Sequence, residues 1–130
     1  MSVGILLITH PGAGQALLAV AERLLGRMPL AVSCFEVDYD TEFSDLIAAA
    51  STALRALDQG DGVLLLTDLY GASPSNFSVQ VEGLGIPTRR VSGLNLPMLL
   101  RALNYADSSL DELADKAAAG GKLGVVVGRG

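Results

Sequence analysis

A single histidine is the residue of this chain best suited to chemistry. His10, the only histidine in 130 residues, ends the apolar run of residues 3–9 and precedes a turn that contains Gly12 and Gly14. A histidine side chain is mostly neutral near neutral pH, and its free ring nitrogen can attack as a nucleophile or exchange a proton. The end of a strand in an open α/β sheet faces the ligand crevice. We therefore expect a working site around His10.

A carboxylate and several helix starts join His10 at this edge of the predicted sheet. Asp68 follows the apolar run of residues 62–67. If the two runs are neighbouring strands, Asp68 can accept a hydrogen bond from one imidazole nitrogen, which leaves the other free to attack. Helices that begin near Gly12, Ser73 and Asn95 would present free N–H groups and positive dipole ends, which suit a phosphate. Ser73 would add a hydroxyl donor, so the combination describes a site that carries a phosphoryl group.

The same residues also have plain structural interpretations. A lone histidine at a strand end is often structural, and Asp68 also fits as a turn residue. Ser73 and Asn95 also fit as helix caps. Gly12 also fits as a residue that only permits a tight turn. Convergence of several such features on one sheet edge is what favours a functional site.

One nucleotide-binding motif competes with this interpretation, and a second is excluded. Gly12-x-Gly14-x-x-Leu17, with Glu36 at the end of the next strand, imitates a dinucleotide fingerprint. Leu17 stands where close helix–strand packing requires a small residue, and the chain offers no second domain to hold a substrate. A Walker phosphate-binding loop is excluded, because no Gly-Lys-Ser/Thr follows the glycines.

Predicted strands and helices alternate almost from end to end. Strands are predicted over residues 3–9, 30–37, 62–67, 88–92 and 123–127. The first two predicted helices run from after Gly14 to Pro29 and from Asp40 or Thr41 to about Gly60. The third runs from Ser73 as N-cap to about Glu82, and the fourth from Asn95 to about Tyr105. The last begins at the Ser109-x-x-Glu112 capping box and ends at Gly120-Gly121. Such alternation indicates an α/β fold in a single domain, residues 1–130. We expect an open, mostly parallel five-stranded sheet, in the order 2-1-3-4 plus an edge strand, with helices on both faces.

Composition and charge exclude several classes of protein. The net charge of -5 argues against binding to nucleic acid. One histidine and one cysteine, Cys34, are too few for a metal centre, and no cofactor is expected. Cys34 lies in an apolar run and fits a buried, inert thiol. The chain has neither a basic leader nor an apolar stretch near the roughly 20 residues of a membrane span, so we expect a cytoplasmic protein that does not insert into a membrane.

Three segments resemble one family over nearly the whole chain: Ile8-Thr9-His10, the segment from Thr67 to Asn76 that reads TDLYGASPSN, and the segment from Gly93 to Leu99 that reads GLNLPML. The chain is similar to the mannose-type IIA component of the bacterial phosphoenolpyruvate-dependent sugar phosphotransferase system. The resemblance implies that His10 accepts a phosphoryl group on Nε2 from the phosphohistidine carrier HPr, with Asp68 on the other nitrogen, and passes it to a histidine of a IIB component. The candidate phosphate-binding residues are Gly12, Tyr70, Gly71, Ser73 and Asn95.

The resemblance also implies a homodimer. Residues 123–127 fit either a last strand exchanged between its subunits or a self-contained edge strand of the same sheet. Two positions depart from a known family member: Tyr70 stands in place of tryptophan and Ala72 in place of glycine. Neither change removes a proposed catalytic group. A second function stays open, that of a regulatory protein whose phosphorylation state sets its binding partner without sugar transport.

Overall fold

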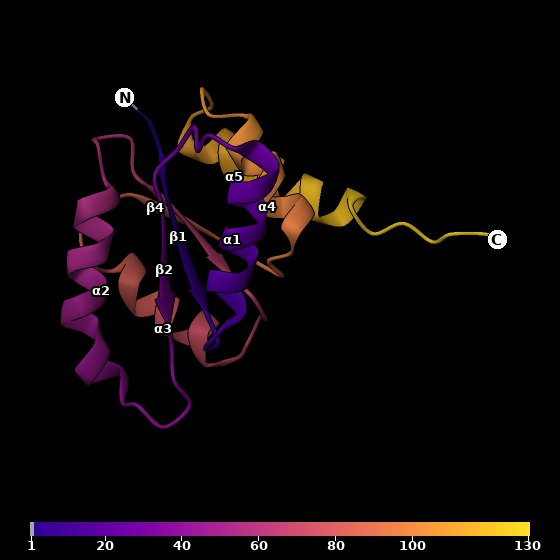
Figure 1. The fold of residues 1–130 in the computed structure, drawn as a ribbon. Helices are drawn as coiled ribbons and strands as arrows, with labels where there is room; N and C mark the ends of the chain where they lie inside the picture. The colour runs from indigo at the N-terminus through magenta and orange to yellow at the C-terminus, as the bar shows by residue number, and fades with distance from the viewer. Residues whose placement is uncertain (1) are drawn as a thin grey trace.

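Four parallel strands form the centre of the molecule, in the order β2-β1-β3-β4 (Figure 1). The structure is a computed structural model that describes residues 2–130. The strands are β1 (Gly4–Thr9), β2 (Val32–Glu36), β3 (Val63–Thr67) and β4 (Thr88–Ser92). The helices are α1 (Ala13–Leu25), α2 (Phe43–Leu57), α3 (Ser73–Glu82), α4 (Leu96–Asn104) and α5 (Leu110–Leu123). The α/β fold and the strand order 2-1-3-4 are confirmed.

Helices cover both faces of the sheet. Helices α1, α4 and α5 lie over one face, and α2 and α3 lie over the other (Figure 1). The central strands β1 and β3 are buried along their whole length, as expected for apolar strands covered on both sides. Phe77 of α3 is buried on the face that α2 and α3 cover. Its ring stacks on Phe35 of β2 and forms an edge-on contact with Phe43 of α2. The core therefore consists of two apolar layers separated by the sheet.

Two helix caps predicted from the sequence are confirmed. Asn95 accepts a hydrogen bond from the Met98 N–H at 2.9 Å and begins α4. Ser109 and Glu112 form the reciprocal capping box at the start of α5. A polar side chain that accepts a first-turn N–H satisfies a donor that the helix itself cannot pair.

Two other predicted helix starts were wrong. Ala72, in extended conformation, is the N-cap of α3, and Ser73 is its first helical residue. Helix α2 begins after Glu42, which makes no side-chain capping bond, so neither Asp40 nor Thr41 caps it. Ser73, Asp40 and Thr41 are all compatible with a cap, but each lies one or two residues from the observed N-cap. Phe43, the first residue of α2, packs against the core, which favours a helix start at that residue.

The predicted fifth strand does not form. Helix α5 continues through Gly120 and Gly121 to Leu123, and residues 124–130 then run away from the body of the molecule (Figure 1). The glycines do not stop the helix, because each lies against α4: a Cβ on Gly120 would overlap Arg101, and a Cβ on Gly121 would meet the Met98 methyl at 2.8 Å. Close packing of α5 on α4 overrides the low helix propensity of glycine.

The topology brings the carboxyl ends of β1 and β3 together. The two strands are paired, with Ile8 beside Thr67. The chain leaves β1 toward α1 on one face and leaves β3 toward α3 on the other. The loops that follow the two strands therefore diverge, and the point of divergence is where open α/β sheets bind ligands.

Candidate functional site

His10 and Asp68 are in direct contact at this point of divergence. Nδ1 of His10 lies 2.7 Å from Oδ2 of Asp68, and the backbone N–H of His10 donates to the same oxygen at 2.9 Å. The two side chains are 21% and 16% exposed. The second oxygen of Asp68, Oδ1, is buried without a hydrogen-bond partner among the described residues. One carboxylate oxygen thus fixes both the ring and the main chain of the histidine.

This contact determines what the imidazole can do. A carboxylate oxygen only accepts hydrogen bonds, so Nδ1 carries the proton when the ring is neutral. The lone pair is then on Nε2, the nitrogen that Asp68 does not engage. A neutral imidazole in this tautomer can attack an electrophile through Nε2, and the carboxylate stabilises the positive charge that develops on the ring.

A hydrogen-bonded turn carries His10 from β1 to α1. The buried Thr9 hydroxyl donates to the His10 carbonyl at 2.9 Å and accepts from the Gly14 N–H at 2.9 Å. A Cβ on Gly14 would lie only 2.9 Å from that hydroxyl oxygen, so a glycine is needed for this approach. Gly12 has φ 89° and is the N-cap of α1. The two glycines noted in the sequence therefore shape the histidine turn.

A carboxylate from β2 accepts a hydrogen bond from the N–H of Gly12. Oε2 of Glu36 accepts this N–H at 2.6 Å. A dinucleotide-binding turn would need the same region for a pyrophosphate, and here a negative charge already fills it. The arrangement therefore disfavours the dinucleotide interpretation. Gly12 as a phosphate-binding residue stays a prediction.

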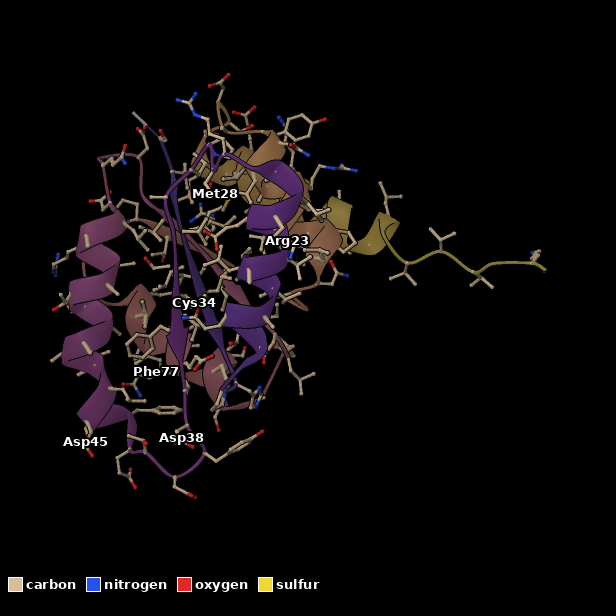
Figure 2. All side chains as sticks on the ribbon, viewed as in Figure 1. Arg23, Met28, Cys34, Asp38, Asp45 and Phe77 are labelled. Carbon is tan, nitrogen blue, oxygen red and sulfur yellow. The ribbon has the colours of Figure 1, made fainter. Side chains whose placement is uncertain are left out.

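An aromatic ring lies beside the histidine. The ring of Tyr39, in the loop between β2 and α2, is 5.3 Å from the His10 ring, centroid to centroid, and tilted by 39°. Tyr39 itself is 71% exposed. Asp38, its neighbour, lies beyond the carboxyl end of β2, at the bottom of Figure 2. The β2–α2 loop thus forms one wall beside the imidazole.

The segment that follows Asp68 contains three of the predicted phosphate-binding residues. Tyr70 is 78% exposed, and Gly71 has φ 83°, a backbone conformation that favours glycine. The side-chain amide of Asn76 donates to the Gly71 carbonyl at 3.2 Å. Ser73 opens α3, with Pro74 behind it in the first turn. Asp68, the loop and the start of α3 are therefore continuous in the chain.

Both polar atoms of the Asn95 side-chain amide make hydrogen bonds. Its oxygen accepts from the Met98 N–H, and its nitrogen donates to the Gly121 carbonyl at 3.1 Å. These bonds begin α4 and tie it to α5. The side chain therefore has a structural role in the contacts present, and its binding of phosphate stays a prediction.

Sequence reasoning did not assign Glu36 or Tyr39 to the histidine site. Glu36 was noted only as the acid that imitates a dinucleotide fingerprint, and Tyr39 carried no signal in a polar loop. Between residues 2 and 130 no group of three or more histidine, cysteine and acidic side chains is arranged to hold a metal ion. Over the same residues, no helix is long and apolar enough to cross a membrane.

Comparison with known proteins connects this geometry to one family. Residues 4–118 match the model of the EIIA-man family, described as the phosphotransferase system fructose IIA component. The mannose-specific EIIAB component of the phosphotransferase system from Escherichia coli K12 is 33% identical over 127 residues, 96% of this chain and 39% of that protein. The chain thus spans about two fifths of the length of this relative.

Two further similarities widen the comparison. The transcriptional regulatory protein LevR of Bacillus subtilis is 29% identical over 112 residues, 83% of this chain and 12% of the regulator. Among solved structures, the mannose/sorbose-specific IIA subunit from Enterococcus faecalis superposes with a TM-score of 0.86 at 25% identity, and the match covers 99% of this chain and 96% of that one.

Proposed function

Because this chain belongs to the EIIA-Man family of phosphotransferase system IIA components, we propose that it is a cytoplasmic phosphoryl carrier that works through His10. It accepts a phosphoryl group from phospho-HPr and passes it to a histidine of a IIB component. The observation that carries the proposal is the 2.7 Å contact between Nδ1 of His10 and Asp68, because it leaves Nε2 as the attacking atom.

Transfer proceeds by direct displacement at phosphorus. The Nε2 lone pair of His10 forms a bond to the phosphorus atom as the P–N bond of the donor breaks, and the donor imidazole leaves with that electron pair. Nδ1 keeps its proton and donates it in a hydrogen bond to Asp68. The negative charge of Asp68 offsets the positive charge of the substituted ring. The second transfer reverses these roles, with the IIB histidine as the attacking group.

The phosphoryl oxygens need hydrogen-bond donors beside Nε2. We propose that the loop after Asp68 and the start of α3 supply them, through Tyr70, Gly71 and the hydroxyl of Ser73. A helix N-terminus offers unpaired N–H groups and a positive dipole end to an anion.

Intact-mass spectrometry tests the carrier function. The chain is incubated with phosphoenolpyruvate, the general enzyme of the phosphotransferase system and HPr. We expect an acid-labile gain of one phosphoryl group, absent in His10→Ala, because no other histidine can take it. Circular dichroism of His10→Ala checks that the fold persists. A wild-type chain that gains no phosphoryl group from a cognate HPr would contradict the proposal.

Similarity to the regulator LevR favours a second candidate, a regulatory protein whose phosphorylation state sets its binding partner. Both functions use the same histidine, so the acceptor discriminates between them. The phosphorylated chain is mixed with a cognate IIB component. Rapid loss of the phosphoryl group to IIB supports the carrier function in sugar transport, whereas retention of the group supports the regulatory one.

We also propose that two copies associate through the tail. Val125, Val126 and Val127 are 74%, 82% and 79% exposed, an unusual exposure for three consecutive valines. Among residues 2–130, strand β4 pairs with β3 alone, so its other edge has backbone groups that a strand from a second copy can pair. A hollow of about 280 Å³, which Ser92, Met98 and Gly121 help to line, lies beside β4.

A further inference from the structure

We propose that Glu36 is a positioning residue for His10: its carboxylate fixes the turn that carries the histidine. The inference rests on the proposed function, since it names how the ring that accepts the phosphoryl group is held. It begins from a bond between two elements, the 2.6 Å contact between Oε2 of Glu36 and the N–H of Gly12.

The register of the sheet brings Glu36 to this turn. Glu36 is the last residue of β2 and pairs with Thr9, the residue before His10. Side chains alternate along a strand, so Cys34 and Glu36 lie on the same face while Phe35 lies on the other. Cys34 packs in the layer beneath α1, and Phe77 lies in the opposite layer (Figure 2). Phe35 stacks on Phe77. The Glu36 carboxylate is thereby directed to the start of α1.

The start of α1 needs an acceptor from elsewhere in the chain. Its N-cap is Gly12, which has no side chain to pair with a first-turn N–H group. Three successive N–H groups are paired instead with acceptors around the turn: Gly12 with Glu36, Ala13 with the His10 carbonyl at 3.2 Å, and Gly14 with the Thr9 hydroxyl. A negative charge at this end also interacts favourably with the helix dipole. Glu36 therefore satisfies the Gly12 N–H from within the chain.

The bond between Glu36 and Gly12 affects His10 because Gly12 is only two residues further along the chain. Asp68 holds the ring and the N–H of His10, and Glu36 holds the main chain at Gly12, immediately beyond Pro11. Without the carboxylate, the Gly12 N–H loses a charge-assisted bond, and the direct contact between Gly12 and β2 is lost. Phosphoryl transfer depends on the alignment of Nε2 with phosphorus, so a small displacement of the ring slows the reaction.

Nuclear magnetic resonance and transfer kinetics on three variants test the proposal. Glu36→Ala removes the acceptor, Glu36→Gln keeps an acceptor oxygen without the charge, and Glu22→Ala is a matched control that removes an exposed acid from α1 itself. We expect Glu36→Ala to broaden the His10 ring resonances and reduce the population with the proton on Nδ1. The rate constant for phosphoryl acceptance should fall roughly tenfold to a hundredfold, with little change in KM for the donor. Glu36→Gln should recover most of the rate, and Glu22→Ala should match the wild type.

The Gly12 amide proton supplies a readout that does not depend on activity. In Glu36→Gln, which retains the size of the side chain, this resonance should move upfield because a neutral oxygen is a weaker acceptor. An unmoved Gly12 resonance, or a wild-type ring spectrum in folded Glu36→Ala, would overturn the proposal. A wild-type chain that takes no phosphoryl group would contradict the proposed function alone, since both spectra still decide the role of Glu36.

Discussion

Asp68 uses its two carboxylate oxygens in different ways. Oδ2 accepts from both Nδ1 and the backbone N–H of His10, whereas Oδ1 is buried and unpaired among the described residues. A side chain that served only as a turn residue would not direct its charge at the imidazole ring. The geometry therefore links Asp68 to the ring, where it fixes the tautomer and offsets charge.

Replacing Asp68 should slow phosphoryl transfer to His10. We expect Asp68→Ala to lower the transfer rate roughly 10²- to 10⁴-fold, because the imidazole loses the group that orients it. Asp68→Asn should be slowed less, since an amide oxygen can still accept from Nδ1 but carries no charge. Asp45→Asn, which neutralises an exposed acid on α2, is the matched control. Rapid-quench kinetics with phospho-HPr gives the rates, and an unchanged rate in Asp68→Ala would remove Asp68 from the mechanism.

The one thiol of the chain should react slowly. Burial, followed by the charges of Glu36 and Glu22, raises the pKa of Cys34 from 9.0 to about 11. Only the thiolate is nucleophilic, so alkylation by iodoacetamide in the native protein should reach half its maximal rate near pH 11, against pH 9 in urea. Half-maximal alkylation of the native protein near pH 9 would contradict this prediction.

The same shift predicts how stability depends on pH. A folded pKa above the unfolded one means that the fold favours the protonated thiol. That contribution is fully present below pH 9 and is lost as the pH rises toward 11. The free energy of unfolding should therefore fall more steeply over this range in the wild type than in Cys34→Ser, which does not titrate there. Glu36→Gln, which removes one of the charges, should lower the midpoint of alkylation.

Single residues could be predicted from sequence only where the chain itself places them. His10 and Asp68 each end an apolar run, so their approach follows once the two strands are neighbours. The contacts of Glu36 and Tyr39 with the histidine turn depend on the register of β2 and on the path of the β2–α2 loop. Hydrophobic periodicity fixes neither, so these two residues emerge only from the three-dimensional structure.

At the scale of elements, the packing of α5 on α4 decides the form of the C-terminal part. Gly120 and Gly121 were predicted to end a helix, yet they lie within α5 where it contacts Arg101 and Met98. Local propensity favours a stop at paired glycines, and close helix packing requires the absence of a side chain. The second requirement prevails, and it could not be read from the sequence because it depends on which helix faces α5.

This contact predicts an unusual cost for alanine in a helix. Alanine is normally better than glycine within a helix by about 1 kcal/mol. In Gly120→Ala, the new methyl group would overlap the Arg101 side chain, so we expect the free energy of unfolding to fall by about 1–3 kcal/mol. Urea denaturation followed by circular dichroism measures the change.

Gly83→Ala is the control for this substitution. Gly83 follows α3 with φ -84°, and a Cβ there has its nearest contact at 3.4 Å, so alanine fits without strain. The control should be neutral or slightly stabilising, because alanine restricts the unfolded chain. Equal stabilities of the Gly120→Ala and Gly83→Ala variants would show that α5 does not pack on α4 as closely as described.

For the molecule as a whole, strand order was predictable and the fate of the last segment was not. Buried apolar runs that alternate with amphipathic helices restrict the sheet to a few topologies, and 2-1-3-4 is among them. Residues 123–127 have the composition of a strand, but β4 receives no further strand within the described chain. We therefore predict that this extended β-prone segment pairs with the β4 edge of another copy.

The tail therefore predicts the oligomeric state. We expect the wild type to be a dimer at micromolar concentration, because three exposed valines and a free β4 edge together provide backbone pairing and apolar burial. Replacing Val125, Val126 and Val127 together by serine should give a monomer in analytical ultracentrifugation, because serine both lowers strand propensity and removes the apolar surface. The control replaces Val20 and Val79, exposed valines on α1 and α3, by serine and should remain dimeric. A wild-type monomer, or a dimer that survives the triple substitution, would exclude the tail as the site of association.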